Sequence, residues 1–414
     1  MLTATCLAAR FGLRRNLLPL GCGLAGLVMN CLMVLVIGKS DTWHVDFNQF
    51  YSAGKLVGSG RLYNWESIRA LELENTSTAV PFGRIPAFAA AFKPLSALPY
   101  PLALSLWLCV GVAALAGFVF LWPFSLRAWA CVAICWSAPV GVCLLLGQDS
   151  TLFLFFAALG LRLLMREHDF WAGVVFSACL AKPHLALLLP VFLVARAKWT
   201  AILGGVAGVS VSLAVSFVAE GRQWPHRLIT LALIPEFDPA AERMPNLRGL
   251  LSFLGGGIAA EVGFGLVVVA AIWFLSRRHP LPTVGALVLA GGLLLSHHTY
   301  VYDALLLLPS LLLPFQIPCL DSMRKWAIIL LSPTPYLFLT AQALSSSWTT
   351  PVGLLVFLAH MAITGYTLTL LAVMLWRLPI HSESLEGGPP NCKRSYDHPH
   401  VSLLTVGPMP NPPR

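Results

Sequence analysis

The chain has 414 residues, of which 57% are hydrophobic and only 11% are charged, and its mean hydropathy is +0.76. Soluble domains carry about 25% charged residues, so this composition excludes an ordinary soluble protein. A hydrocarbon core about 30 Å thick needs roughly 20 apolar residues per helix, and the chain has room for about eleven or twelve such segments. We therefore expect an all-α polytopic membrane protein.

The formal net charge is +9. An excess of this size can indicate nucleic acid binding, but its distribution favours a different explanation. If the arginines near the N-terminus face the cytoplasm and the spans alternate, the surplus of Lys and Arg falls in cytoplasmic segments, as the positive-inside rule requires. We expect a multi-pass protein of the plasma (inner) membrane with both termini in the cytoplasm, and no nucleic acid partner.

The first expected span, residues 17–38, is interpreted as uncleaved because its apolar part is long for a signal peptide and no convincing small-x-small cleavage site follows it. It leads to a first outer loop, residues 39–100, which is too long for a simple connector. Within this loop, residues 53–73 predict one amphipathic helix, and the prolines of residues 81–101 predict short interfacial helices separated by turns.

The later spans are expected at residues 102–122, 128–146, 151–165, 201–218, 250–275, 284–295, 305–317, 326–340 and 352–376. A second outer loop covers residues 220–248. Residues 1–376 thus form one integral membrane domain. The tail, residues 377–414, is rich in Pro, Gly and Ser and is expected to be disordered.

Residues 170–194 are long enough for one span, but a single span here would place the positively charged loops that follow on the outer side, against the positive-inside rule. The sequence Lys182-Pro183-His184 lies near the middle of this segment. Proline lacks a backbone donor and disfavours helix at the preceding residue. We therefore expect two short helices, residues 170–181 and 185–194, with the chain turning at Lys182 near the outer face.

With this topology, polar residues from distant parts of the sequence fall at the outer ends of helices. They are Asp41, His44, Asp46, Gln148, Asp149, Lys182, His184, Arg248, His297, His298 and Asp303. A carboxylate such as Asp46 can take the proton of an attacking hydroxyl. A cation such as Lys182, with the imidazole of His298, can neutralise a phosphate leaving group. This combination suits glycosyl transfer from a lipid phosphate, and equally other phospholipid chemistry.

A series of short motifs runs in order through residues 40–310. The motifs are Asp46-Phe-x-x-Phe-Tyr51-x-Ala53, Gly60-x-Leu62-Tyr63, Phe92-x-Pro94-Leu-x-x-Leu-Pro99, Gly147-Gln148-Asp149-Ser150, Ala181-Lys182-Pro183-x-x-Ala186, Asn246-Leu-Arg-Gly249-Leu and Ser296-His-His298-Thr-Tyr-Val-Tyr-Asp303. Their order and spacing together resemble glycosyltransferase family 87. These are polytopic enzymes of GT-C type, typified by mannosyltransferases that use polyprenyl-phosphate mannose.

The resemblance implies a GT-C-type fold, a polyprenyl-phosphate sugar donor and an essential acidic residue in the first outer loop. The expected site residues are Asp46 as catalytic base, Lys182, His298 and Arg248 at the donor phosphate, and Gln148, Tyr51 and Asp41 at the substrate. The sequence departs from the family pattern at His297, where proline is usual. It departs again at Arg84-Ile-Pro86-Ala-Phe88, which replaces a tyrosine-rich stretch, so acceptor or sugar preference is open.

Each of these residues also has an ordinary structural explanation. Asp46 can cap the next helix, and Lys182 can extend toward lipid headgroups from a helix break. The aromatic residues that follow Asp41 can form an interfacial belt instead of a sugar platform. Asp41, His44 and Asp46 could bind a divalent ion, but a metal is not indicated and no cofactor is expected. The ten cysteines form no C-x-x-C pair.

The predicted function is that of a membrane hexosyltransferase in glycolipid or cell-envelope biosynthesis. It would move a hexose, with mannose favoured, from a polyprenyl-phosphate donor to a glycolipid or glycan acceptor at the outer leaflet. One alternative is a transporter or lipid flippase for a phosphate-bearing lipid, which predicts charged or broken helices near the midplane and repeat symmetry. Another is a noncatalytic assembly subunit, in which Asp46 could be replaced without loss.

Overall fold

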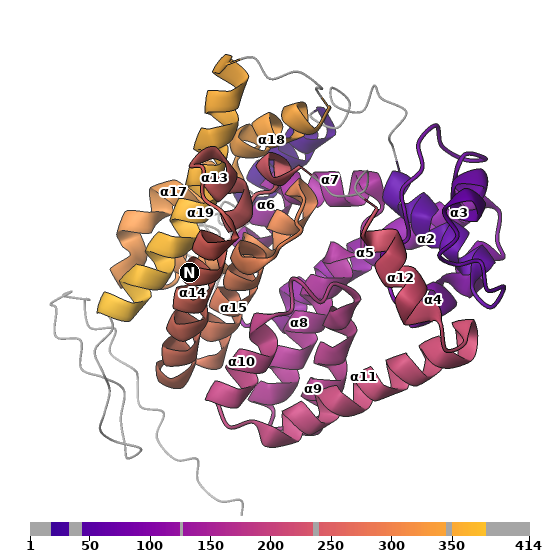
Figure 1. Ribbon diagram of the computed structural model, residues 1–414. Helices are drawn as coiled ribbons and strands as arrows, with labels where there is room; N and C mark the ends of the chain where they lie inside the picture. Colours follow the sequence, from indigo (N-terminus) through magenta and orange to yellow (C-terminus); the bar gives the residue numbers. More distant parts are fainter. Residues whose placement is uncertain (1–17, 33–43, 125–126, 235–239, 345–349, 378–414) are drawn as a thin grey trace, which may run out of the picture. The chain divides into compact units, whose positions relative to one another are not determined.

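The computed structural model of the protein describes residues 18–32, 44–124, 127–234, 240–344 and 350–377. Every regular element within these ranges is a helix, which confirms the expected all-α class (Figure 1). Asp41 and the tail beyond residue 377 lie outside the described residues, so the predictions made for them stay predictions.

Four helices are long and apolar enough to cross a membrane. They are α5 (Tyr100–Leu121), α11 (Trp199–Glu220), α14 (Ile258–Arg278) and α19 (Thr350–Arg377). A fifth span results if α6 (Arg127–Trp136) and α7 (Ala138–Leu146), which are bent by 63°, cross together. Shorter apolar helices accompany them at Leu18–Leu32, Ser150–Met165, Asp169–Ala181, Leu281–Leu295 and Val301–Phe315. The protein is polytopic, with fewer long helices among the described residues than the expected spans.

Proline and glycine divide several of the expected spans. The expected span 250–275 is instead α13 (Leu247–Phe253) followed by α14, with Gly255 between them at φ +69°. The expected span 326–340 is instead α17 (Arg324–Leu331) and α18 (Thr334–Leu344), separated at Pro333. Glycine adopts positive φ without steric cost, and proline cannot continue the hydrogen bonding of the preceding turn.

The predicted interruption at Lys182 is confirmed. The chain runs through α9 (Asp169–Ser177) and the 3₁₀ turn η1 (Ala178–Ala181), leaves helical geometry at Lys182, and resumes in α10 (Leu188–Ala195). Lys182 has φ −123° and ψ 74°, which lies outside the helical region that a following proline disfavours. The lysine side chain therefore projects from a break in the helix.

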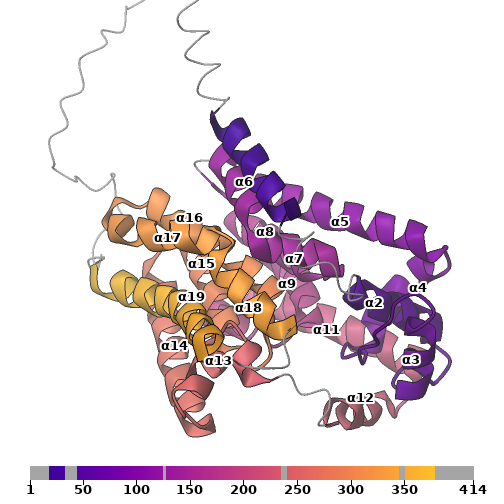
Figure 2. The ribbon, with the colours of Figure 1, turned by 90° about the horizontal axis from the view of Figure 1, so that it is seen from above.

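The first loop contains α2 (Val45–Leu56), α3 (Trp65–Glu72) and α4 (Pro86–Ser96), which lie together in Figures 1 and 2. The single helix predicted for residues 53–73 is wrong. Gly58 and Gly60 have φ of +86° and +73°, so the chain turns between α2 and α3. Phe47, Phe50 and Trp107 belong to a separate apolar core that joins these helices to α5.

The larger core packs α8 (Ser150–Met165) and α15 (Leu281–Leu295) around the 3₁₀ helix η4 (Val301–Leu307). Every residue of η4 is buried, so a short polar motif at its start is held inside the protein. The other elements are α12 (Trp224–Ala232), η3 (Ala241–Arg243), α16 (Leu308–Leu312), η5 (Leu313–Phe315) and η6 (Pro318–Met323).

Candidate active site

The turn between α7 and α8 brings the first loop against the larger core. Gly147 ends α7 in the left-handed conformation, with φ +71° and ψ 34°. A Cβ atom at Gly147 would lie 2.5 Å from Cβ of Phe47, so only glycine allows α2 to approach this closely. Trp107 Nε1 donates to the Gly147 carbonyl at 2.7 Å. The close approach places Asp46, in the first turn of α2, beside Gln148 and Asp149.

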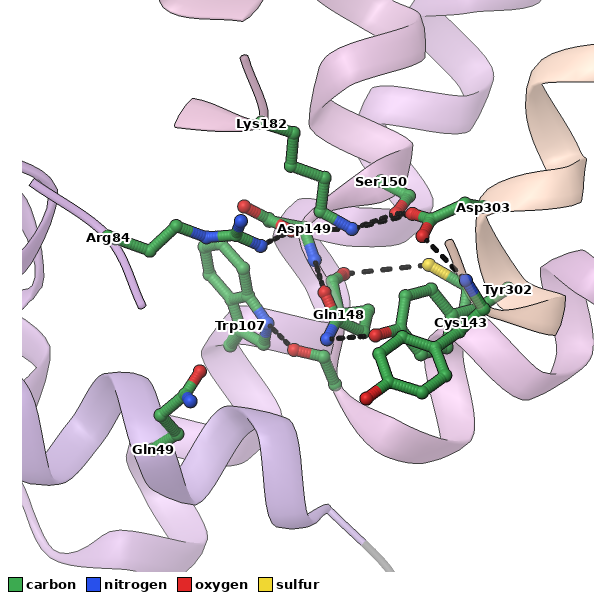
Figure 3. Close-up of polar contacts among 12 residues, drawn as sticks. Gln49, Arg84, Trp107, Cys143, Gln148, Asp149, Ser150, Lys182, Tyr302 and Asp303 are labelled. Atoms are coloured by element: carbon green, nitrogen blue, oxygen red, sulfur yellow. Dashed lines mark hydrogen bonds and ion pairs between the residues drawn. The ribbon is translucent and has the colours of Figure 1, made fainter. Parts of the chain in front are cut away.

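Lys182 is the centre of a buried polar network (Figure 3). Its ammonium group lies 2.7 Å from Asp303 Oδ1, 2.5 Å from Ser150 Oγ and 3.2 Å from Asp149 Oδ1. Ser150 in turn donates to Asp303 Oδ1 at 2.7 Å. A lysine ammonium has three N–H donors, and here each has an acceptor.

Asp303 also fixes the start of η4. Its Oδ2 accepts the backbone N–H of Tyr300 at 3.1 Å, as in a capping box. Tyr302 precedes Asp303 in the chain, and the centre of its ring lies 4.8 Å from the Lys182 ammonium. The Tyr302 hydroxyl accepts a hydrogen bond from Gln148 Nε2 at 3.1 Å. Segments that are far apart in sequence are thereby joined through Lys182 and Gln148.

Arg84 completes the network from the first loop, and Figure 3 shows it directed at Asp149. Its Nη2 atom lies 3.2 Å from Asp149 Oδ1, the same oxygen that contacts Lys182. The guanidinium carbon lies 6.0 Å from the ring centre of Phe50 and 5.9 Å from that of Phe88. Arg84 is not among the site residues expected from the sequence, where it appears only in a stretch that departs from the family pattern. A lone arginine in an otherwise apolar, proline-rich stretch was the signal available.

Paired charges keep the buried ions of this network charged. Burial by itself would raise the pKa of Asp149, but Arg84 and Lys182 outweigh it and lower the pKa of this carboxyl. Burial would likewise lower the pKa of Lys182, and the carboxylates of Asp303 and Asp149 raise it instead. The ion cluster is thus carboxylate and ammonium at neutral pH.

Asp46 has a different protonation equilibrium from Asp149. It is half-buried in the first turn of α2, and burial is the main reason that its pKa rises to about 6. A hydrogen bond from Gln148 and the charges of Lys182 and Arg84 lower the pKa of Asp46 in part, and the negative charge of Asp149 opposes them. A carboxylate with a pKa near neutrality suits general base catalysis.

Two histidines lie next to the network. The ring of His184 contacts that of His298 edge to face at 5.9 Å, and His298 contacts Tyr300 at 5.0 Å. Burial lowers the pKa of His184 to about 3, so this imidazole is neutral at physiological pH. His298 therefore reaches the neighbourhood of Asp303 through Tyr300.

Arg248 and Tyr51 occupy other surroundings. Arg248 Nη1 lies 2.8 Å from His297 Nε2, and His297 Nδ1 lies 3.2 Å from Glu261 Oε1, beside a separate pocket at the start of α14. Tyr51 is buried in the aromatic core of the first loop, where its hydroxyl donates to the Leu98 carbonyl at 2.7 Å. The described contacts thus bring Asp46, Gln148 and Lys182 together, and they place Arg248 and Tyr51 apart from them.

A divalent ion at Asp41, His44 and Asp46 would require a residue outside the described ranges, since Asp41 is one of the three. Among the residues that the structure describes, no group of three or more His, Cys, Asp and Glu side chains is arranged to hold a metal ion.

A model of glycosyltransferase family 87 matches residues 86–297, which is just over half of the 414 residues. The matched range includes Gln148, Asp149 and Lys182, and Asp46 and Asp303 lie on either side of it. No curated protein and no solved structure matches the chain.

Proposed function

The chain belongs to glycosyltransferase family 87 and is a membrane glycosyltransferase, and we propose that it transfers a hexose from a polyprenyl-phosphate donor to a glycolipid or glycan. Membership in a transferase family sets aside the transporter and flippase alternative. Mannose is the first candidate sugar. The proposed location is the plasma (inner) membrane, with both termini in the cytoplasm and the site facing outside.

The proposed reaction is a displacement at C1 of the donor hexose. The oxygen of an acceptor hydroxyl forms a bond to C1, and the bond between C1 and the phosphate oxygen breaks. The electron pair leaves with the polyprenyl phosphate, and the acceptor proton moves to Asp46. A lipid phosphate donor fits a site outside the cytoplasm, where nucleotide sugars are scarce, and the sequence holds no nucleotide-binding motif.

The observation that carries the proposal is the position of Asp46 beside two cations, Lys182 and Arg84. Burial holds the pKa of Asp46 at about 6, so it is mostly a base at pH 7 and can still accept a proton. Lys182 and Arg84 supply positive potential where negative charge develops on the departing phosphate. His298 is proposed to contact the donor phosphate from the neighbouring segment, and Gln148 and Asp41 to contact substrate. Arg248 and Tyr51 contact other partners, so they are not proposed for this site.

The test is transfer from synthetic polyprenyl-phosphate mannose to a lipid extract by purified protein in nanodiscs. Wild type is compared with Asp46→Asn and with the control Asp169→Asn, which removes a carboxylate paired with Lys198 elsewhere in the protein. We expect Asp46→Asn to lose transfer by about 10²- to 10⁴-fold while the control keeps it.

Equal transfer by wild type and Asp46→Asn would remove Asp46 from the chemistry. No transfer by either protein would reject polyprenyl-phosphate mannose as the donor and direct the search to other polyprenyl-phosphate hexoses.

A further inference from the structure

The two cations of the network, Lys182 and Arg84, differ in how many of their N–H donors already have an acceptor. The Lys182 ammonium has three N–H donors, and Asp303, Ser150 and Asp149 accept all three. Its side chain is only 3% exposed. To donate to a substrate phosphate, Lys182 would have to release a buried carboxylate, which is costly inside a protein. Its contribution to a phosphate is therefore its charge at a distance.

Arg84 is in the opposite situation. A guanidinium has five N–H donors, and among the described residues Asp149 Oδ1 is the one hydrogen-bond acceptor that it meets. Its Nε is buried and lacks a hydrogen-bond partner within the described part of the chain. The side chain is 13% exposed, against 3% for Lys182. Arg84 thus keeps several directed donors, and a ligand can reach it.

The surroundings of Arg84 hold its planar group in one orientation. Asp149 fixes one edge of the guanidinium by the 3.2 Å ion pair, and the rings of Phe50 and Phe88 lie near its carbon atom. Arginine matches the oxygens of a phosphate with two parallel N–H groups, which a lysine ammonium cannot do. An arginine held at one edge presents its remaining N–H groups as a ready-made phosphate contact.

We propose that Arg84 is the residue that hydrogen-bonds the donor phosphate and the polyprenyl phosphate that leaves, with Asp149 as the group that orients it. The inference rests on the proposed function, since it assigns the phosphate of the same donor. It also gives a role to the stretch around Arg84, where this sequence departs from the tyrosine-rich pattern of its family.

The experiment compares two probes that differ only in the phosphate: a short-chain polyprenyl phosphate and the polyprenol of the same length. Binding of each is measured in detergent micelles for wild type, Arg84→Gln, Arg84→Lys and the control Arg69→Gln, an exposed arginine of α3. Wild type and the control are expected to bind the phosphate form about 10- to 100-fold more tightly than the alcohol.

Arg84→Gln is expected to lose most of that preference, and Arg84→Lys to lose part of it, because lysine keeps the charge beside Asp149 without the planar fork. The melting temperature of each variant checks folding, and Arg84→Lys keeps the partner of Asp149 if Arg84→Gln is unstable. The role of Arg84 would be overturned if folded Arg84→Gln and Arg84→Lys both preferred the phosphate to the alcohol as strongly as wild type does. The proposed function would then still stand. Equal binding of the two probes by wild type would overturn the inference together with the donor class.

Discussion

Lys182 Nζ lies 2.7 Å from Asp303 Oδ1, although the two residues are 121 positions apart in sequence. Both side chains are buried, and both also contact Ser150. The pair joins the helix break after η1 to the start of η4. These segments are far apart in sequence, so the arrangement of the site depends on this ion pair.

Replacing Lys182 should destabilise the protein strongly. Lys182→Met leaves the carboxylates of Asp149 and Asp303 buried without this cation, which costs about 3–5 kcal/mol. The control Lys198→Met removes a partly exposed ion pair with Asp169 and should cost about 1 kcal/mol or less. Denaturant titration in micelles measures both.

A double variant distinguishes the stability that Lys182→Met loses through the unpaired carboxylate from the stability that it loses through packing. Lys182→Met with Asp303→Asn removes both charges and should recover part of the stability that Lys182→Met loses. Similar losses in Lys182→Met and Lys198→Met would contradict a structural role for the buried pair.

The rate of transfer should depend on the ionisation of Asp46. Because its pKa is raised to about 6, Asp46 is deprotonated and competent above this pH, and kcat/KM should fall as pH drops below it. Gln148→Leu removes a hydrogen bond that lowers the pKa of Asp46, so the acid limb should move to higher pH by up to about one unit. The position of the limb, and not the maximal rate, is the readout. An acid limb at the same pH in both proteins would argue against Asp46 as the titrating base.

Glu72 should make stability depend on pH. It is fully buried, its Oε2 accepts the Val80 N–H at 2.7 Å, and burial raises its pKa from 4.5 to about 8. Between these pH values the unfolded chain releases a proton that the folded protein keeps, so wild-type stability declines as pH rises through this window and levels off above it.

Glu72→Gln carries no charge and should exceed wild type in stability by an amount that grows from pH 5 to pH 8, to a few kcal/mol. Glu66→Gln, an exposed position on the same helix, is the control and should show no such trend. Melting curves across this range make the comparison, and parallel curves for Glu72→Gln and wild type would rule the effect out.

Gly147 should matter for activity, because it sets how closely α2 approaches the turn between α7 and α8. In Gly147→Ala the new Cβ would lie 2.5 Å from Phe47 Cβ and push α2, with Asp46, away from Gln148. A displacement of about 1 Å at a reacting group can cost roughly 10²-fold in rate. Gly60→Ala has a similar φ of +73°, but its Cβ would meet nothing closer than 3.9 Å, so it should keep its rate. Equal rates in the two variants would show that the approach of Phe47 to Gly147 is not required.

Much of the fold follows from composition and from proline. The apolar composition predicts an all-helical membrane protein, and Lys182-Pro183 predicts the break that the structure contains. The helix predicted for residues 53–73 is wrong because Gly58 and Gly60 adopt positive φ, so the chain turns between α2 and α3.

The candidate site could be predicted only in part. Alternation of the spans predicts Gln148, Lys182 and Asp303 at one membrane face. In the structure Lys182 contacts Asp303, and Gln148 contacts the neighbouring Tyr302, while their catalytic roles remain predictions. The pairing of Arg84 with Asp149 joins residues 65 positions apart, and no local pattern encodes such a pair. Tyr51 and Arg248 contact other partners because core packing, and not the position of a helix end, decides where a side chain points.

The separation of Lys182 from Asp303 has a consequence for biogenesis. Synthesis at about 5–20 residues per second places Asp303 on the order of ten seconds behind Lys182. During that interval the lysine lacks the carboxylate that it contacts at 2.7 Å in the finished protein. Asp149 and Ser150 precede Lys182 in the chain and can hold its ammonium group until then, so Asp303 is the last of the three acceptors to be made and its arrival completes the junction between the helix break and η4.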